Sequence, residues 1–313
     1  MKALILAGGF ATRLWPLSEK RTKPLLLVGG KPIVSHLVEK IPKDLEIIIS
    51  TSEQFKEHFE KWKEKHFRDR KIKILAEPSK SEKDKKGAVG AMSYAISQHE
   101  IDDDLLILAG DNILDFDLGD FIKSFKGNSL VAVYDIGDRE AAKKFGVVEI
   151  KDNKIVDFEE KPSEPKSSTV STLCYILPKE TLGVLKEFAK TGKDNAGDLI
   201  AHLVKETPHD IEPFVFSGFW FDVGSFEAYL EANKKLQTKP IISKEAEVKN
   251  SKIIGSSYIC DGTVVLDSTI EDSVIMENCK IVNSVIRNCV IDDGCVIKDA
   301  TLENQLIRGR TII

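Results

Sequence analysis

The last quarter of the chain carries an aliphatic repeat whose period fits neither an α-helix nor an ordinary β-strand. Aliphatic side chains recur in steps of five or six at Ile253, Ile259, Val265, Ile270, Ile275, Ile281, Ile286, Ile291, Ile297, Leu302, Ile307 and Ile312. Helices repeat about every 3.6 residues and half-buried strands about every two. A step of about six is typical of a parallel β-helix, in which each short strand forms one side of a coil and stacked coils bury a shared core.

A small side chain stands two positions before most of these aliphatic residues. The small residues are Ser251, Ser257, Thr263, Ser268, Ser273, Cys279, Ser284, Cys289, Cys295 and Ala300. We interpret them as the places where the chain turns tightly inward. The three cysteines among them are then compact core residues, not metal ligands or disulfide partners. The segment resembles a short left-handed parallel β-helix built of hexapeptide-like repeats, and its five-residue steps are expected to be irregularities of that repeat.

The first 236 residues show a different pattern, in which strands alternate with helices. Short aliphatic runs at 3–6, 46–50, 72–75, 105–109 and 130–134 end at turn residues and are predicted to be buried strands. Aromatic residues at helical spacing predict an amphipathic helix over 53–67. The fold class is therefore α/β, with a mostly parallel, Rossmann-like sheet. We place a catalytic domain at 1–236 and the β-helix domain at 237–313, because the polar segment 236–247 separates the two patterns.

Composition excludes several classes of function. The chain has 313 residues, with 45 Lys and Arg against 50 Asp and Glu, for a net charge of −5 and no long block of one sign. Bulk charge therefore predicts neither a nucleic-acid nor a membrane partner. The opening apolar run is too short for a signal-peptide core or a membrane span, so a cytoplasmic protein is expected.

A glycine-rich segment with cations follows the first predicted strand. It reads Gly8-Gly9-Phe10-Ala11-Thr12-Arg13-Leu14-Trp15-Pro16-Leu17-Ser18, and Lys23-Pro24-Leu25 comes shortly after. Glycines let backbone N–H groups approach a phosphate closely, and Arg13 and Lys23 supply positive charge for a polyphosphate. Because Pro32 follows Gly30-Lys31, the segment is not a Walker A loop, and it also lacks the dinucleotide-binding glycine pattern. It is predicted to be a phosphate cradle.

Two aspartates are candidate metal ligands. Asp111 follows the run 105–109, so its carboxylate should project from the carboxyl end of a parallel strand, where open α/β sheets hold their ligands. Asp222 lies between Trp220-Phe221 and Gly224 and fits a buried turn beside it. Two carboxylates together with phosphate oxygens suit Mg²⁺. On spacing alone, a turn or helix-cap role for either aspartate is about as good an interpretation.

With these motifs in order, the sequence resembles the sugar-1-phosphate nucleotidylyltransferases, also called NDP-sugar pyrophosphorylases, over essentially its full length. The resemblance lies in the opening pattern 8–17, the Lys-Pro-Leu at 23–25, and the segments 108–112, 145–148, 159–162 and 220–224. It implies catalytic roles for Arg13 and Lys23 and a Mg²⁺ site at Asp111 and Asp222. It implies a nucleotide site at Leu6, Gly8, Gly9, Thr12, Arg13, Glu77 and Gly87. It implies a sugar-phosphate site at Gly146, Glu160 and Lys161.

This resemblance implies a reaction that needs no side-chain nucleophile. A sugar-1-phosphate is already an anionic oxygen nucleophile, so attack on the α-phosphorus of an NTP depends on positioning and charge neutralisation. The expected products are an NDP-sugar and pyrophosphate.

The nucleotide base and the sugar of the two substrates are predicted from single residues and short segments. A Glu side chain at 77 can only accept hydrogen bonds, and guanine offers two adjacent donors, whereas uracil or thymine offers one. Residues 15–18 are also similar to mannose-1-phosphate guanylyltransferases. The sequence thus favours GTP with mannose-1-phosphate or another manno-configured sugar. One observation counts against this preference: the segment 171–175 lacks the Asn or Gly that relatives often carry before the aromatic residue. Uridylyl or thymidylyl transfer to glucose-1-phosphate is therefore kept as the alternative.

Two rival functions remain to be weighed. An additional acetyltransferase activity is disfavoured because all six histidines precede residue 237, which leaves the β-helix without a His base. A purely regulatory or scaffold subunit is disfavoured because the full set of candidate phosphate and metal residues is present. The expected partners are an NTP and a sugar-1-phosphate, and the β-helix is expected to assemble a homo-oligomer.

Overall fold

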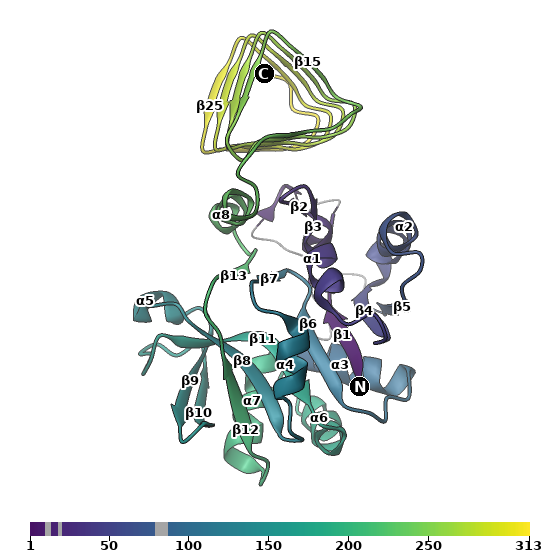
Figure 1. Cartoon of the computed structure of the whole chain (residues 1–313), viewed down its shortest axis with the longest axis vertical. Coiled ribbons are helices and arrows are strands. Elements are labelled where there is room, and N and C mark those ends of the chain that lie inside the picture. Colours follow the sequence, from purple (N-terminus) through teal and green to yellow (C-terminus); the bar gives the residue numbers. More distant parts are fainter. Residues whose placement is uncertain (10–13, 18–20, 79–86) are drawn as a thin grey trace. The chain divides into compact units, whose positions relative to one another are not determined.

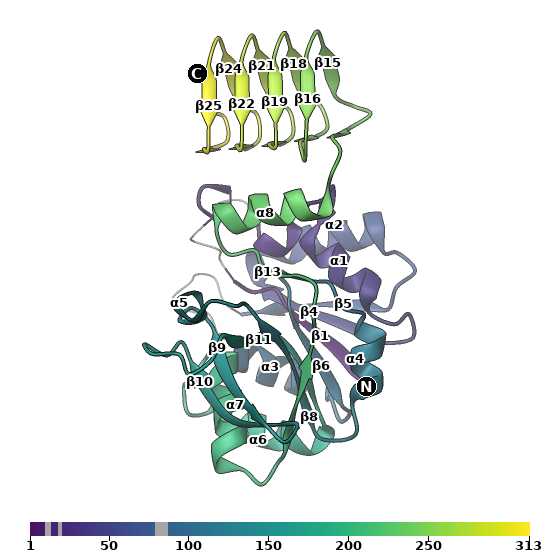
Figure 2. The same ribbon diagram turned by 60° about the vertical axis from the view of Figure 1, so that its left-hand side comes forward.

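The computed structural model describes residues 1–9, 14–17, 21–78 and 87–313. The chain divides into two compact units, shown in Figures 1 and 2. The sheet unit comprises Met1–Phe10 and Val34–Asp222, and the β-helix unit comprises Ala11–Ile33 and Val223–Ile313. Among the described residues, no helix combines the length and the apolar character needed to cross a bilayer.

A mixed nine-stranded sheet forms the centre of the sheet unit. Its strands are β1 (Lys2–Leu6), β4 (Ile47–Ser52), β5 (Ile72–Glu77), β6 (Leu105–Ala109), β8 (Ser129–Asp135), β9 (Gly146–Lys151), β10 (Lys154–Glu160), β11 (Thr169–Leu177) and β12 (Ile211–Val215). The main path runs β10-β9-β11-β6-β1-β4-β5, with β8 on β11 and β12 on β8. Strands β6, β1, β4 and β5 are mutually parallel, and β11 runs antiparallel to β6. The predicted strands and the mostly parallel, Rossmann-like α/β sheet are confirmed.

Helices supply the apolar cover of this sheet. They are α1 (Ile33–Lys40), α2 (Lys56–His66), α3 (Gly87–Gln98), α4 (Leu118–Ser124), α5 (Arg139–Ala142), α6 (Leu182–Ala189) and α7 (Ala196–Glu206). Apolar side chains of α3, α6 and α7 join strand residues such as Leu4 and Ile107 in one buried cluster. The helix predicted over 53–67 is α2 with the 3₁₀ turn Glu53–Phe55 before it, and it buries Phe59 and Trp62.

The C-terminal segment of the β-helix unit is a parallel β-helix with a triangular cross-section (Figure 1). Its sides are three sheets: β14 (Ile241–Ile242), β17 (Tyr258–Ile259), β20 (Val274–Ile275), β23 (Val290–Ile291) and β26 (Leu306–Ile307); β15 (Glu247–Lys249), β18 (Val264–Leu266), β21 (Lys280–Val282) and β24 (Val296–Lys298); and β16 (Lys252–Ile254), β19 (Thr269–Glu271), β22 (Val285–Arg287) and β25 (Thr301–Glu303). Figure 2 shows the coils as a stack. The repeated aliphatic residues form its core, with Ile270, Ile275 and Ile281 fully buried. The repeat is confirmed as a β-helix.

The five-residue steps are the rule of this β-helix and not irregularities, which corrects the sequence-based expectation. Ile259, Ile275, Ile291 and Ile307 pair in register, so each of these coils has 16 residues, whereas the first coil, from Ile242 to Ile259, has 17. Each 16-residue coil has two five-residue steps and one six-residue step between its aliphatic core residues, and a single residue with positive φ lies at each corner. These corner residues are Asn250, Asp267, Asn283 and Asp299; Gly255, Asp272, Asn288 and Asn304; and Gly262, Asn278, Gly294 and Arg310. Asn, Asp and Gly tolerate this left-handed conformation best.

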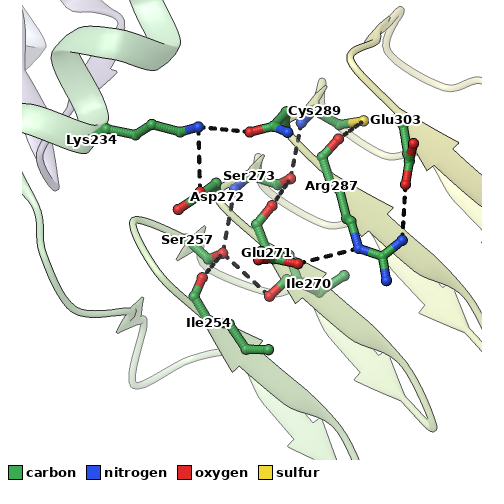
Figure 3. Close-up of polar contacts among 11 residues, drawn as sticks. Lys234, Ile254, Ser257, Ile270, Glu271, Asp272, Ser273, Arg287, Cys289 and Glu303 are labelled. Atoms are coloured by element: carbon green, nitrogen blue, oxygen red, sulfur yellow. Dashed lines mark hydrogen bonds and ion pairs between the residues drawn. The ribbon is translucent and has the colours of Figure 1, made fainter.

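The small residue after each corner has a hydrogen-bonding role that the sequence pattern does not reveal (Figure 3). Ser257 Oγ accepts a hydrogen bond from the backbone N–H of Ser273 at 3.3 Å, and Ser273 Oγ accepts one from that of Cys289 at 2.9 Å. Ser273 Oγ also donates to the Glu271 carbonyl at 2.7 Å. All three small side chains are fully buried. Hydroxyl groups thus link successive coils at the corners, where the strand ladders stop.

We predict that Ser273→Ala lowers the free energy of unfolding by about 1–3 kcal/mol, because it leaves the buried N–H of Cys289 without its acceptor. Urea unfolding followed by circular dichroism measures this. Ser273→Cys is the matched control, since cysteine occupies the equivalent position at 289, and it should lose less. An alanine variant as stable as the wild type contradicts the role of the hydroxyl.

Candidate functional site

The carboxyl ends of four parallel strands lie in one row at the edge of the sheet. Leu6 at the end of β1 pairs with Ala109 of β6 on one side and with Ser50 of β4 on the other, and β4 in turn pairs Ser52 with Glu77. The N–H of Gly110 donates to the carbonyl of Leu6 at 2.8 Å. The structure therefore brings three predicted site residues, Leu6, Glu77 and Asp111, to the same edge. This is where open α/β sheets hold their ligands.

Asp111 and Asp222 come together through a small second sheet. Strand β7 (Asn112–Leu114) pairs antiparallel with β13 (Trp220–Asp222), and Asp222 lies opposite Asn112. Asp111 directly precedes β7 and Asp222 ends β13, so the two residues are one position apart in register, and both side chains are half-buried. Nothing in the strand pattern of the sequence indicates this pairing.

Asn112 and Trp220 hold the carboxylate of Asp111 in place. The Asn112 side-chain Nδ2 donates to Asp111 Oδ1 at 3.2 Å, and the Trp220 indole N–H donates to Asn112 Oδ1. Asn112 is buried, and the indole packs edge-on against the Phe145 ring at 5.0 Å between centroids. The sequence interpretation assigned neither residue a role. The signal that could have found them is an amide beside the acid and an indole N–H that needs an acceptor when it is covered.

The two aspartates fit a magnesium ion. Mg²⁺ in nucleotide-using sites is held by one or two carboxylates together with water and substrate phosphates, not by a cage of protein ligands. Across residues 1–9, 14–17, 21–78 and 87–313, no group of three or more His, Cys, Asp or Glu gathers as a closed metal site. Asp111 and Asp222 would supply the one or two carboxylates of such a site.

Glu77 is a buried carboxylate at the same edge. Its side chain is 3% exposed, and Oε1 accepts a hydrogen bond from Ser50 Oγ at 2.9 Å. It lies directly against Gly8, where a Cβ would come within 2.9 Å of Oε1. Any larger residue at position 8 would displace the acid. Gly9 is exposed, and a Cβ there would meet nothing within 4 Å.

Four more predicted site residues belong to other parts of the chain. Gly87 opens α3 with a φ of +65°, and a Cβ there would lie 2.2 Å from Asp194 Cβ, so only glycine fits. Lys23 begins the 3₁₀ turn Lys23–Leu25 in the β-helix unit. Thr12 and Arg13 lie outside the described residues.

The three residues predicted to bind the sugar phosphate cluster on β9 and β10. Gly146 pairs with Glu160, and Lys161 Nζ lies 3.1 Å from Glu160 Oε1. Lys161 itself has a φ of +47°, and its N–H donates to the Phe145 carbonyl at 3.0 Å. Glu160 is held between two glycines: a Cβ at Gly146 would lie 3.1 Å from Oε2, and one at Gly197 would lie 2.0 Å from it. Gly197, near the start of α7, is a further residue that the sequence interpretation missed.

An irregular segment of β11 flanks this edge. Cys174 pairs with Leu108 of β6, so the residues of β11 before it continue past the carboxyl end of β6 beside Asp111. The pairing of β11 with β8 shifts between Ser171 and Tyr175, and Leu173 within the shift has a φ of +52°. A leucine in this region is strained, and such strain concentrates at functional sites. The segment 171–175, in which the sequence lacked the expected Asn or Gly, therefore keeps a conformation suited to those residues.

Comparisons with known proteins agree with this geometry. The family model described as "Nucleotidyl transferase" matches residues 2–239, and "GlmU-like, C-terminal hexapeptide" matches residues 226–302. "Bifunctional protein GlmU" of Methanocaldococcus jannaschii is 30% identical over 266 residues, which cover 83% of this chain and 60% of that protein. The chain spans about three fifths of the length of the GlmU relatives that it matches.

Other relatives carry different names. A candidate mannose-1-phosphate guanyltransferase of Sulfolobus acidocaldarius is 26% identical, over 88% of this chain and 76% of that protein. A glucose-1-phosphate adenylyltransferase of Thermosipho africanus is 30% identical, over 89% of this chain and 72% of that protein. Among solved structures, a candidate glucose-1-phosphate thymidylyltransferase from Bacillus anthracis is similar with a TM-score of 0.66 and 27% identity, over 75% of this chain and 95% of that one.

The hydrogen bonds of Asn112 generate a prediction. Asn112→Ala should lower the free energy of unfolding by about 1–3 kcal/mol, because the Trp220 indole loses its acceptor and Asp111 loses a donor. Urea unfolding of the full chain measures the change. Asn128→Ala is the matched control, since Asn128 also donates to a carboxylate, Glu212, but is exposed, and its change should stay within about 0.5 kcal/mol. Equal losses in the two variants would contradict the special role of Asn112.

Proposed function

The chain belongs to the nucleotidyl transferase family, and from that premise we propose that it transfers a nucleotidyl group from an NTP to a sugar-1-phosphate and releases pyrophosphate. The observation that supports this most is the row of parallel strand ends at which Glu77 and Asp111 lie, with Asp222 on the strand β13 that pairs with β7 directly after Asp111. The glycine-rich segment follows β1 directly in the sequence, and Lys23 comes shortly after that segment. Residues 1–236 would carry the transfer.

The proposed chemistry is an in-line displacement. An oxygen of the sugar-1-phosphate attacks the α-phosphorus, the bond from the α-phosphorus to the bridging oxygen breaks, and pyrophosphate leaves with the electron pair. Arg13 and the backbone of Gly8 and Gly9 would hold the β- and γ-phosphates, and Lys23 would neutralise charge that develops at the α-phosphate. Mg²⁺ held by the two aspartates would supply further charge neutralisation when bound.

The incoming sugar phosphate would be held on β9 and β10. Lys161 supplies a cation for the phosphate, while the carboxylate of Glu160 can accept hydrogen bonds from sugar hydroxyls. A Cβ at Gly146 would lie 2.4 Å from Phe158 Cζ and 3.1 Å from Glu160 Oε2, so glycine at this position lets the carboxylate keep its place. No residue here forms a covalent bond to the substrate, because the nucleophile is the sugar phosphate itself.

We expect Asp111→Asn to lower kcat by about 100-fold or more, because the amide keeps the shape of the side chain but loses the negative charge that binds the cation. Pyrophosphate release under saturating substrates measures the effect, and thermal unfolding should be unchanged. Asp120→Asn, at an exposed position of α4, is the control and should keep wild-type turnover. A near-normal kcat for Asp111→Asn would contradict the assignment of Asp111 as a metal ligand.

Glu77 is proposed to select guanine. Its carboxylate is buried at the sheet edge and can only accept hydrogen bonds, and guanine presents the N1–H and the 2-amino group side by side. The proposed donor is therefore GTP and the proposed acceptor mannose-1-phosphate or another manno-configured sugar. The relatives, whose names span guanyl, adenylyl and thymidylyl transfer, leave uridylyl or thymidylyl transfer to glucose-1-phosphate as the second candidate.

A panel of GTP, ATP, UTP and dTTP against mannose-1-phosphate and glucose-1-phosphate tests this selection. The wild type should show its highest kcat/KM with GTP. Glu77→Gln should lower kcat/KM for GTP by about tenfold or more while leaving the other nucleotides less affected, because one of the two donors of the base then faces the amide NH₂ in place of an acceptor oxygen. Preference for UTP or dTTP in the wild type would overturn the guanylyl assignment. No pyrophosphate release with any pair would favour a scaffold subunit.

Residues 237–313 are proposed to serve assembly and not a second reaction. All six histidines lie before residue 237, so the β-helix offers no imidazole base for acetyl transfer. Homo-oligomerisation through this segment stays a prediction.

A further inference from the structure

Residues 14–17 and 21–33, which include Lys23, pack as part of the β-helix unit. Helix α8 (Phe226–Leu236) holds the second half of this segment. The Tyr229 hydroxyl donates to the Leu27 carbonyl at 2.6 Å, and the N–H of Gly29 donates to Asn233 Oδ1 at 3.0 Å. Strands β2 (Leu27–Val28) and β3 (Lys31–Pro32) form a hairpin there. The end of the segment that follows Lys23 is thus fixed on α8.

The first half of the segment contacts one corner of the β-helix in three successive coils. The Arg21 guanidinium donates to Glu277 Oε2 at 2.9 Å, to Asp293 and to the sulfur of Met276 at 3.3 Å. Glu277 and Asp293 are 16 residues apart and hold the same place in adjacent coils, where the N–H of Glu277 donates to Asp293 Oδ1 at 3.2 Å. In the next coil, the Arg308 guanidinium lies 5.4 Å from the centre of the Trp15 ring.

The bridge at Arg21 is a partly buried charge cluster. The side chains of Arg21, Glu277 and Asp293 are 24%, 36% and 44% exposed. Burial alone would lower the pKa of Arg21, but the two facing carboxylates outweigh it and raise that pKa. Burial, and then the hydrogen bond and repulsion from Glu277, raise the pKa of Asp293 to about 6. One cation therefore holds two carboxylates that would otherwise repel each other, and removing it disturbs the whole corner.

Arg21 stands two residues before Lys23, and the link between them is rigid. Thr22 is fully buried, its carbonyl accepts from the N–H of Leu25 at 3.1 Å, and the carbonyl of Lys23 accepts from the N–H of Leu26 at 2.9 Å. Residues 22–26 therefore form one hydrogen-bonded turn that begins directly after Arg21.

We propose that Arg21 is a positioning residue, whose bridge to Glu277 and Asp293 on the β-helix corner holds Lys23 in the conformation that binds the nucleotide phosphates. The β-helix then sets the affinity of the enzyme for its NTP in addition to any role in assembly. This inference rests on the proposed nucleotidyl transfer.

The bridge is not needed to keep the β-helix on α8, which has its own contacts. Lys234 Nζ lies 2.8 Å from Asn288 Oδ1 and 3.3 Å from Asp272 Oδ2 at a second corner (Figure 3), and Gln237 Nε2 donates to the Ser257 carbonyl at 2.7 Å. Loss of Arg21 should therefore disturb the segment before Lys23 without separating α8 from the coils.

The test compares Arg21→Gln with Glu277→Gln/Asp293→Asn, which removes the charges from the other side of the bridge. Both should raise KM for the NTP by about tenfold, because phosphate binding tolerates little misplacement of a cation, while KM for the sugar-1-phosphate stays near wild type. Combining the three substitutions should add no further loss. Arg21→Lys, which keeps the charge, should restore part of the affinity.

Arg287→Gln is the matched control, and it should change no kinetic parameter. Arg287 also bridges two carboxylates in neighbouring coils, Glu271 at 3.2 Å and Glu303 at 2.9 Å, but its partners belong to the β-helix alone (Figure 3). Equal effects of Arg21→Gln and Arg287→Gln would overturn the inference, as would an Arg21→Gln variant with an unchanged KM for the NTP.

Hydrogen exchange of the backbone amides of residues 22–28 separates this inference from the proposed function, because it requires no turnover. Arg21→Gln should speed the exchange of these amides, and Arg287→Gln should not. Unchanged exchange in Arg21→Gln overturns the inference whatever the activity of the wild type. A wild type that binds no NTP and releases no pyrophosphate overturns the proposed function instead.

Discussion

Parallel pairing in register is the constraint on which both units of this chain depend. In the sheet unit it aligns the carboxyl ends of β1, β4, β5 and β6, so that residues far apart in the sequence arrive at one edge. In the β-helix it places each strand residue over its counterpart 16 or, in the first coil, 17 positions away. The same geometry thus produces a row of candidate ligand-binding groups in one unit and columns of equivalent corners in the other.

At the sheet edge, the parallel strands bring the acidic residues to one place, and contacts with neighbouring side chains set the orientation of each carboxylate. Asp111 follows its strand directly, but its direction depends on Asn112, and Asn112 in turn depends on the indole of Trp220. Glu77 is held by Ser50 and has room only because Gly8 lacks a side chain. Glu160 is held in the same manner between glycines. Each acid of the candidate site therefore has a polar partner that orients it or a glycine that makes space for it.

In the β-helix unit, the columns of corners provide surfaces that other segments use. One column presents acids of adjacent coils to a single arginine, and a second presents Asp272 and Asn288 to a lysine of α8. Because the hydroxyl contacts at the corners tie the coils together, these groups keep a fixed spacing. A rigid surface of this kind is suited to hold the segment that carries Lys23, the cation proposed to bind phosphate.

The sequence by itself determined the two fold classes, because hydrophobic periodicity reports directly which side chains are buried. It also indicated the glycine-rich segment, the acid after β6 and the small residues of the β-helix, since each lies within a local pattern. Only the tertiary structure decided that Asp222 pairs beside Asp111, that Gly197 borders Glu160, and that residues 11–33 group with the β-helix. It also showed that five-residue sides are regular, because single left-handed residues turn the corners. These features join residues distant in the chain or depend on backbone angles, and neither leaves a local pattern in the sequence.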